Sequence, residues 1–228
     1  MHPLIRLSLC LAFAGALFDS PVAPIRPALA AQQAEGRDVD LGIRELPATV
    51  EAFLALRDQL ATSPEGAVAI FLVALNIYAE NRTLGRTLLT LAVDARHLKD
   101  SRAPEAHQGK LIAEARTWEI NRVLEGSPAT ARAYWKGASP ANGYAPAKPY
   151  AVALYLQPGA RGRLDQYARA TTGREVEEWQ FFVRSEGYRN AGGGGRPISV
   201  ARNEAGLWQV TRFNGVVAAV MKPADGSP

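Results

Sequence analysis

Residues Tyr134 to Tyr150 read Y-W-K-G-A-S-P-A-N-G-Y-A-P-A-K-P-Y, a stretch with four aromatic residues and three prolines around one Asn-Gly pair. Prolines fix φ, and Ser139-Pro140 and Asn142-Gly143 are turn dipeptides. This stretch therefore loses less chain entropy on ordering than a linker of the same length. It predicts an ordered loop over residues 127–150, and the hydrophobic pattern changes from helical to extended across it.

Ahead of the loop, residues 46–126 show the apolar spacing of helices. Thr49 is a candidate N-cap of a first helix. Ser63-Pro64-Glu65 predicts a second helix, because it combines a capping hydroxyl, a proline at the first helical position and an acid at the positive end of the helix dipole. Apolar residues then cover nearly every face from Val68 to Tyr78, which predicts a central buried helix.

Two shorter helices are expected to complete the helical part. Residues 84–93 predict a third helix on the same core. Pro104 is a candidate start of a fourth helix, and Gly126 is its expected end. The apolar face of this fourth helix is expected to contain Leu111, Ala115 and Trp118.

Beyond the loop, residues 151–223 alternate apolar and polar side chains with the period of two that is typical of strands. Asn214-Gly215 lies between two strand-like runs, 208–210 and 216–221. This pair predicts a hairpin, because a type I′ turn needs positive φ at both central residues. Helices followed by strands indicate a single α+β domain over residues 46–223, with an N-terminal helical layer packed on a C-terminal antiparallel β-meander.

The first thirty residues have the pattern of a signal peptide. Arg6 supplies a positive start, Leu7 to Phe18 form an apolar run of 12 residues, and Ala28-Leu29-Ala30 is a small-x-small cleavage motif. The run is shorter than the roughly 20 residues of a membrane span, although an uncleaved anchor is the alternative. We expect a bacterial protein that is exported to the periplasm or the medium, with no transmembrane span after cleavage and a flexible lead-in over residues 31–45.

Charge and cysteine content exclude several classes of function. Removing residues 1–30 takes away Arg6, Arg26 and Asp19 and leaves 24 basic and 21 acidic side chains, a net charge of +3. These charges are interleaved, so nucleic acid is not an expected partner. Cys10 is the single cysteine and lies in the leader, which excludes disulfides, thiol catalysis and thiolate metal sites from the folded domain.

Most candidate binding residues lie in the loop. Tyr and Trp rings give large amphipathic contact areas at low entropic cost, so they suit a platform for a sugar, a peptide or a partner protein. The alternative, which we favour, is that the rings cover the end of the helical layer. Asn142 is a further candidate, although its position in a turn dipeptide favours a role in the turn. The four rings are those of Tyr134, Trp135, Tyr144 and Tyr150.

Arg196 is the remaining candidate binding residue, at the start of an expected strand beside a proline. Its planar guanidinium suits pairing with a buried acid or a loop carbonyl, which we favour, or binding of an anionic ligand. The glycines at 192–195 lack the Gly-Lys-Ser/Thr ending of a phosphate loop and favour a hairpin loop instead.

No motif points to catalysis or to a metal. Asp94 and His97 lie one helical turn apart, but the local sequence offers no further ligands, and a solvated pair is the favoured interpretation. His107 has no spacing partner. The glutamates within residues 175–178 resemble the paired carboxylates of glycosidases, yet charges that protect an edge strand explain them better. We therefore expect no catalytic residue, no metal and no cofactor.

Three stretches of the sequence resemble motifs of an uncharacterised family of bacterial exported proteins and lipoproteins. The chain has Y-W-K-G-A-S-P-A-N-G-Y-A-P from Tyr134, then R-P-I-S-V at Arg196 and G-L-W-Q-V at Gly206. Members of that family carry an aromatic pair, a Gly-Ala-x-Pro-x-Asn-x-Tyr-x-Pro core, and later Arg-Pro-Ile and Gly-x-Trp. The resemblance covers roughly residues 47–223. It implies a shared fold and no assigned activity, and the chain departs from the family pattern at Asn190 to Gly195.

The expected function is a non-catalytic ligand-binding or protein-interaction module of the cell envelope, whose partner is an unknown small molecule or an envelope protein. One alternative is a hydrolase whose site is assembled from dispersed residues. A cavity that holds Arg196, a carboxylate and His97 or His107 would favour that alternative. The other alternative is a purely structural envelope protein.

Overall fold

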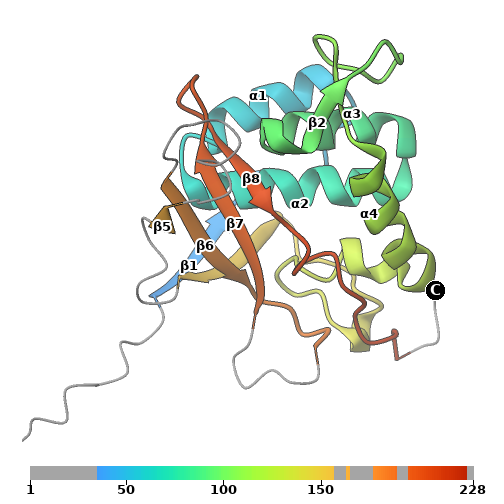
Figure 1. Ribbon diagram of the computed structural model, residues 1–228. Coiled ribbons are helices and arrows are strands. Elements are labelled where there is room, and N and C mark those ends of the chain that lie inside the picture. Colours follow the sequence, from blue (N-terminus) through green and yellow to red (C-terminus); the bar gives the residue numbers. More distant parts are fainter. Residues whose placement is uncertain (1–34, 157–162, 165–176, 189–194, 225–228) are drawn as a thin grey trace, which may run out of the picture. The chain divides into compact units, whose positions relative to one another are not determined.

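The computed structural model describes residues 35–156, 163–164, 177–188 and 195–224, and these belong to one compact unit, Gln33–Pro228. Four α-helices and a mostly antiparallel sheet confirm the α+β class (Figure 1). The helices are α1 (Val50–Leu60), α2 (Pro64–Glu80), α3 (Arg82–Ala92) and α4 (Glu114–Gly126). The strands are β1 (Glu35–Asp40), β2 (Leu98–Asp100), β3 (Lys110–Ile112), β4 (Ala151–Leu156), β5 (Arg163–Leu164), β6 (Glu177–Val183), β7 (Arg196–Arg202) and β8 (Trp208–Arg212).

Local signals start the first two helices as predicted. The Thr49 hydroxyl accepts a hydrogen bond from the backbone N–H of Ala52 at 3.2 Å, and the Ser63 hydroxyl accepts one from Gly66 at 3.0 Å. These side chains satisfy backbone donors that the first turn of a helix leaves free. No described helix has the length and hydropathy of a membrane-crossing segment.

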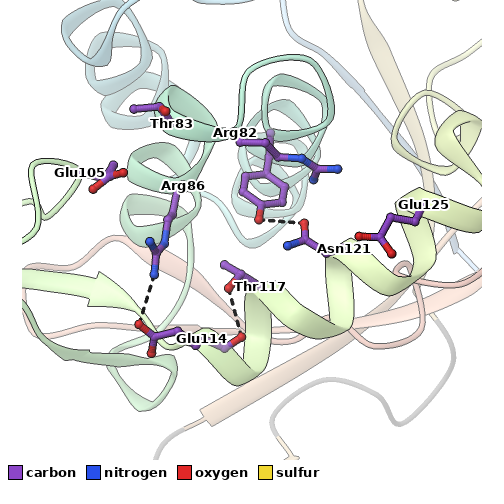
Figure 2. A pocket seen from close by; sticks show the side chains of 9 residues that line it. Arg82, Thr83, Arg86, Glu105, Glu114, Thr117, Asn121 and Glu125 are labelled. Atoms are coloured by element: carbon purple, nitrogen blue, oxygen red, sulfur yellow. Dashed lines mark hydrogen bonds and ion pairs between the residues drawn. The ribbon is translucent and has the colours of Figure 1, made fainter.

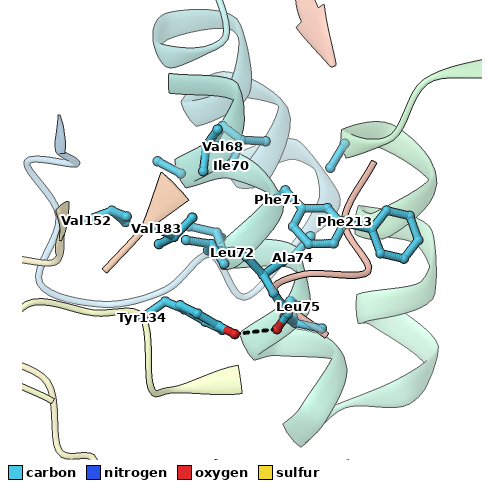
Figure 3. Packing of buried hydrophobic residues seen from close by; sticks show 14 of the residues in the cluster. Val68, Ile70, Phe71, Leu72, Ala74, Leu75, Tyr134, Val152, Val183 and Phe213 are labelled. Atoms are coloured by element: carbon cyan, nitrogen blue, oxygen red, sulfur yellow. Dashed lines mark hydrogen bonds between the residues drawn. The ribbon is translucent and has the colours of Figure 1, made fainter. Parts of the chain in front are cut away.

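Helix α2 is the centre of the core. All residues from Gly66 to Tyr78 are buried, which confirms the prediction of a helix that is covered on every face. Helices α1 and α3 contact it, and so do strands β1, β4, β7 and β8 of the sheet. Figure 3 shows apolar side chains of α2 beside Val152 and Val183 of the sheet, and Phe71 stacks on Phe213 with the ring centroids 5.1 Å apart.

The main sheet has the strand order β1-β4-β6-β7-β8, with β5 also paired to β6, and every pairing is antiparallel. Leu154 lies opposite Val183, Phe181 opposite Ile198, and Val200 opposite Val210. Large apolar side chains therefore face one another across the strands, which stabilises the sheet on its core side. A second, smaller sheet pairs β2 with β3.

Part of the expected flexible lead-in is a strand. Residues 35–40 form β1, which pairs with β4, and Leu41 continues the pairing through a hydrogen bond to the carbonyl of Tyr150. β1 is the edge strand of the sheet. Edge strands commonly carry charged residues, so E-G-R-D-V-D lacks the apolar alternation that predicts a strand.

The prediction of the fourth helix was wrong in its first half. Residues 98–112 form β2, a turn and β3, and α4 begins only at Glu114. Gln108 and Gly109 both have positive φ in that turn. Leu111 is therefore buried in β3, whereas Trp118 is 61% exposed on α4 rather than part of an apolar face.

The hairpin predicted at Asn214-Gly215 does not form, because residues 213–224 contain no strand. The backbone N–H groups of Val216 and Val217 instead both bond to the carbonyl of Phe213. A Cβ at Gly215 would lie 2.3 Å from the carbonyl oxygen of Pro197, so this glycine permits a close backbone contact with β7.

Candidate functional site

The four predicted loop rings belong to the core. Tyr134, Trp135, Tyr144 and Tyr150 are 1%, 2%, 0% and 9% exposed. Trp135 donates its indole N–H to Oδ1 of the buried Asn76 on α2 at 2.9 Å. A platform for a partner needs exposed ring faces, so these rings offer their contact area to the core and not to a ligand.

Tyrosine hydroxyls hold the segment that follows β8. Tyr134 donates to the carbonyl of Val216 at 2.7 Å, Tyr188 to that of Ala218 at 3.1 Å, and Tyr144 to that of Met221 at 2.6 Å. The hydroxyls of Tyr134 and Tyr188 also lie within hydrogen-bonding distance of each other, so the two phenolic protons are shared among this contact and those to Val216 and Ala218. Burial raises the pKa of Tyr134 well above its usual value and also raises the pKa of Tyr188, so both hydroxyls keep their protons.

Asn142 and Arg196 also have internal partners. Oδ1 of Asn142 accepts from the backbone N–H of Ser139 at 2.9 Å, and its Nδ2 donates to the carbonyls of Gly137 and Ala145. Asn142 therefore folds the loop. Arg196 places its guanidinium 3.8 Å from the ring centroid of Tyr188, a cation–π contact in place of the expected acid or carbonyl.

A hollow of about 540 Å³ lies beside these tyrosines. Its lining is mainly backbone and apolar side chains, so it brings few polar groups together. Of the sequence-predicted binding residues, none lines it. The lining residues are Pro140, Gly187, Tyr188, Ala219, Val220, Met221 and Lys222.

A second pocket, of about 380 Å³, is lined mainly by α3 and α4, and all of its lining residues have polar or charged side chains (Figure 2). We call it the α3–α4 pocket. Its α4 wall is one polar row at helical spacing, and the N-terminal part of α3 forms the opposite wall. Tyr78 of α2 and Glu105, from the turn between β2 and β3, complete it. The lining residues are Tyr78, Arg82, Thr83, Arg86, Glu105, Glu114, Thr117, Asn121 and Glu125.

Hydrogen bonds fix two of the pocket's walls. Tyr78 donates its hydroxyl to Oδ1 of Asn121 at 2.9 Å, which orients the amide. Nη2 of Arg86 lies 3.4 Å from Oε1 of Glu114, and Glu114 also pairs with Lys99. The hydrogen bond from Lys99 lowers the pKa of Glu114, so this carboxylate is charged at neutral pH.

Other donors in the α3–α4 pocket have no acceptor among the described residues. Nε of Arg86 is buried without a partner. Nδ2 of Asn121 donates to no described residue, and Arg82 lies 4.6 Å over the ring of Tyr78. Buried donors are almost always paired in native proteins, so an unpaired one indicates that a water or a ligand supplies the acceptor.

The sequence analysis missed this pocket because it misplaced the start of α4. Glu114, Thr117, Asn121 and Glu125 recur at the spacing of one helix face, and Arg82 and Arg86 lie four residues apart. That polar row was the available signal. An apolar face through Leu111 and Trp118 was assigned in its place.

His97 and Glu178 are both buried. The Asp94–His97 pair was expected to be solvated, and Glu178 was expected to be a charge that protects an edge strand, but its strand β6 lies between β4 and β7 inside the sheet. His97 is 7% exposed and its Nε2 lies 2.8 Å from the carbonyl of Thr211. A carbonyl only accepts, so Nε2 carries the proton and Nδ1, which has no partner among the described residues, is bare. Glu178 accepts from the Thr211 hydroxyl at 2.5 Å and pairs with Arg212 at 3.0 Å, while Glu175 lies outside the described residues.

Acidification should destabilise the protein through His97. Burial lowers its pKa below 6.5, with Arg116 and Arg96 acting in the same direction and the Thr211 carbonyl and Asp94 opposing them. The unfolded chain then binds the proton first, so the free energy of unfolding is constant above pH 6.5 and falls as the pH drops below it. Melting temperatures between pH 5.5 and 7.5 should show this slope in the wild type and in His107→Gln. The slope should be smaller in His97→Gln, and an equal slope there would contradict the assignment.

The arrangement of the two hollows does not favour the hydrolase alternative. Neither is lined by Arg196, His97 or His107. Among the described residues, no three His, Cys, Asp or Glu side chains are placed to hold a metal ion. The chemistry that the α3–α4 pocket does offer is hydrogen bonding and ion pairing with a polar molecule.

Comparison with known proteins gives a family. A family model described as "Domain of unknown function (DUF6935)" matches residues 45–224, so the chain belongs to that family. No curated protein and no solved structure matches the chain. The expectation of an uncharacterised family is confirmed.

Proposed function

We propose that this protein is an exported, non-catalytic module of the bacterial envelope that binds a small polar ligand in the α3–α4 pocket. The observation that carries the proposal is that Asn121 lines this pocket with its amide oriented by Tyr78, and that its Nδ2 donates to no described residue. The guanidinium of Arg82, which also lines the pocket, likewise has no acceptor among the described residues. The pocket's volume of about 380 Å³ suits a small molecule.

Ligand binding is tested by the melting temperature of the purified protein. The probes are D-glucose, L-alanine, trialanine, inorganic phosphate and spermidine, each at 10 mM. A ligand present at ten times its Kd should raise the melting temperature by about 3 °C. The shift should disappear in Asn121→Ala, which removes a pocket donor, and persist in Arg44→Gln. Arg44 is exposed and does not line the pocket. Absence of a shift with every probe would contradict the proposal.

Export is supported by the pattern of residues 1–30 and is tested separately. Expression of the full chain in a Gram-negative host should give a periplasmic product whose mass corresponds to cleavage after Ala30. A full-length product in the cytoplasm would contradict export. It would leave the binding proposal unaffected.

A second candidate function is protein interaction through the exposed side of α4. Trp118 is 61% exposed, and Arg122 lies 5.2 Å from its ring centroid. Trp and Arg are the residue types that most often dominate the binding energy of interfaces. Sedimentation of the wild type and Trp118→Ser, each over a hundredfold range of concentration, tests whether this side mediates self-association. Identical profiles would leave the surface without an assigned partner.

A further inference from the structure

The charges of the α3–α4 pocket are nearly balanced. Two arginines and three glutamates line it, and Lys99, which pairs with Glu114, supplies a third positive charge next to the lining. A phosphate would meet three carboxylates at close range, and a polyamine would meet two guanidinium groups. A ligand that carries one charge of each sign avoids both conflicts.

The unpaired donors of the pocket fit a carboxylate. They are Nδ2 of Asn121 and the guanidinium of Arg82, which is held over the ring of Tyr78. A carboxylate has two oxygens and about four acceptor sites, and guanidinium groups bind it with short, strong hydrogen bonds. Figure 2 shows Arg82 and Asn121 on opposite walls of the pocket.

The unpaired acceptors fit an ammonium group. No described residue donates to the carboxylates of Glu105 or Glu125, and both line the pocket. Glu125 lies one helical turn beyond Asn121 on the same face of α4, about 6 Å further along the helix axis. An ammonium group that is bonded to Glu125 can therefore belong to the same ligand as a carboxylate that is bonded to Asn121.

The dimensions of the pocket match an amino acid or a short peptide. The α4 wall from Glu114 to Glu125 spans eleven residue-to-residue steps, or about 16 Å of helix axis. An extended peptide of three or four residues measures about 10–14 Å. A free amino acid fills only part of this length, and a tripeptide fills most of it.

We propose that the ligand is dipolar: an amino acid or short peptide whose free carboxylate binds Arg82 and Asn121 and whose free ammonium group binds Glu125. This inference rests on the proposed function, because it assigns a chemical class to the same pocket. The two ends of the ligand are recognised separately. Each end therefore has its own test.

The probes are L-alanine, trialanine with free ends, trialanine amide and N-acetyl-trialanine, and the measurement is isothermal titration calorimetry. Trialanine should bind, and capping either end should weaken its binding about ten-fold or more, because a charge-assisted hydrogen bond is lost. If L-alanine binds as tightly as trialanine, the ligand is a free amino acid. If trialanine binds more tightly, the ligand is a peptide.

Two variants assign the ends of the ligand to residues. In Arg82→Gln the free acid and the amide should bind with equal affinity, and in Glu125→Gln the free amine and the acetylated peptide should bind with equal affinity. Arg44→Gln should leave both ratios as in the wild type. Arg82 and Glu125 are both exposed, so both variants should fold like the wild type.

The outcomes separate this inference from the proposed function. Equal binding of capped and uncapped trialanine, or binding of D-glucose, phosphate or spermidine without binding of either free-ended probe, would overturn the dipolar ligand and leave the pocket a binding site. No binding of any probe would overturn both.

Discussion

Replacing Trp135 with alanine should lower the free energy of unfolding by about 4 kcal/mol, the cost typical of removing a buried Trp ring. The ring is 2% exposed and packs edge-on against Tyr150 with the centroids 5.1 Å apart. Its indole N–H is also the donor to Oδ1 of Asn76, inside the most buried helix. The variant therefore loses core contacts and leaves a buried amide oxygen without its donor. Urea denaturation of the purified variant measures the effect.

Trp118→Ala is the matched control for this variant. It removes the same side chain from a position that is 61% exposed, so the free energy of unfolding should change by no more than about 0.5 kcal/mol. Trp135→Phe should fall between the two, because it keeps an aromatic ring and loses the N–H donor. Equal stability of Trp135→Ala and the wild type would show that the Trp135 ring does not stabilise the core.

The helical layer was predictable where the signals are local. The caps Thr49 and Ser63 each accept from a backbone donor three residues away, and the apolar run of α2 requires burial whatever packs against it. The segments expected as strands near Val152, Trp179, Ile198 and Trp208 fall within β4, β6, β7 and β8. In each case the information lies within a few residues of the element.

Elements that depend on distant partners could not be predicted in this way. β1 is a charged sequence that becomes a strand only because β4 offers an edge for pairing. The turn at Asn214-Gly215 follows the sequence rule for a hairpin, but Tyr134, Tyr144 and Tyr188 bind the carbonyls that a following strand would use. Tertiary hydrogen bonds prevail here over a local turn preference.

The same distinction applies to the candidate sites. The aromatic residues near Tyr134 were conspicuous in the sequence, and the structure places their rings in the core. The α3–α4 pocket combines residues from α2, α3, α4 and the turn before β3, and none of these segments carries a motif. Its recognition required the position of the Asn121 amide, which Tyr78 orients and whose Nδ2 donates to no described residue, and only coordinates provide this.

Tyr134→Phe, which removes one oxygen atom, should cause the second-largest loss in the free energy of unfolding among the predicted variants. The Tyr134 hydroxyl donates to Val216 and is hydrogen-bonded to Tyr188, and the side chain is 1% exposed. In Tyr134→Phe the Val216 carbonyl loses its donor and the Tyr188 hydroxyl loses a partner, both in a buried position. The expected loss is about 3 kcal/mol in the free energy of unfolding, at the upper end for unsatisfied buried groups.

Tyr150→Phe is the control, because it removes the same atom from a ring that is 9% exposed and whose hydroxyl bonds to no described residue. Its free energy of unfolding should change by no more than about 0.5 kcal/mol.

Amide hydrogen exchange gives a local measurement that separates the two variants. The amide of Met221 donates to the Gly187 carbonyl. In Tyr134→Phe this amide should exchange faster than in the wild type, because tyrosine hydroxyls rather than strand pairing hold the segment after β8 to the core. Unchanged exchange at Met221 together with unchanged stability would contradict the claim that tyrosine hydroxyls hold the segment after β8 to the core.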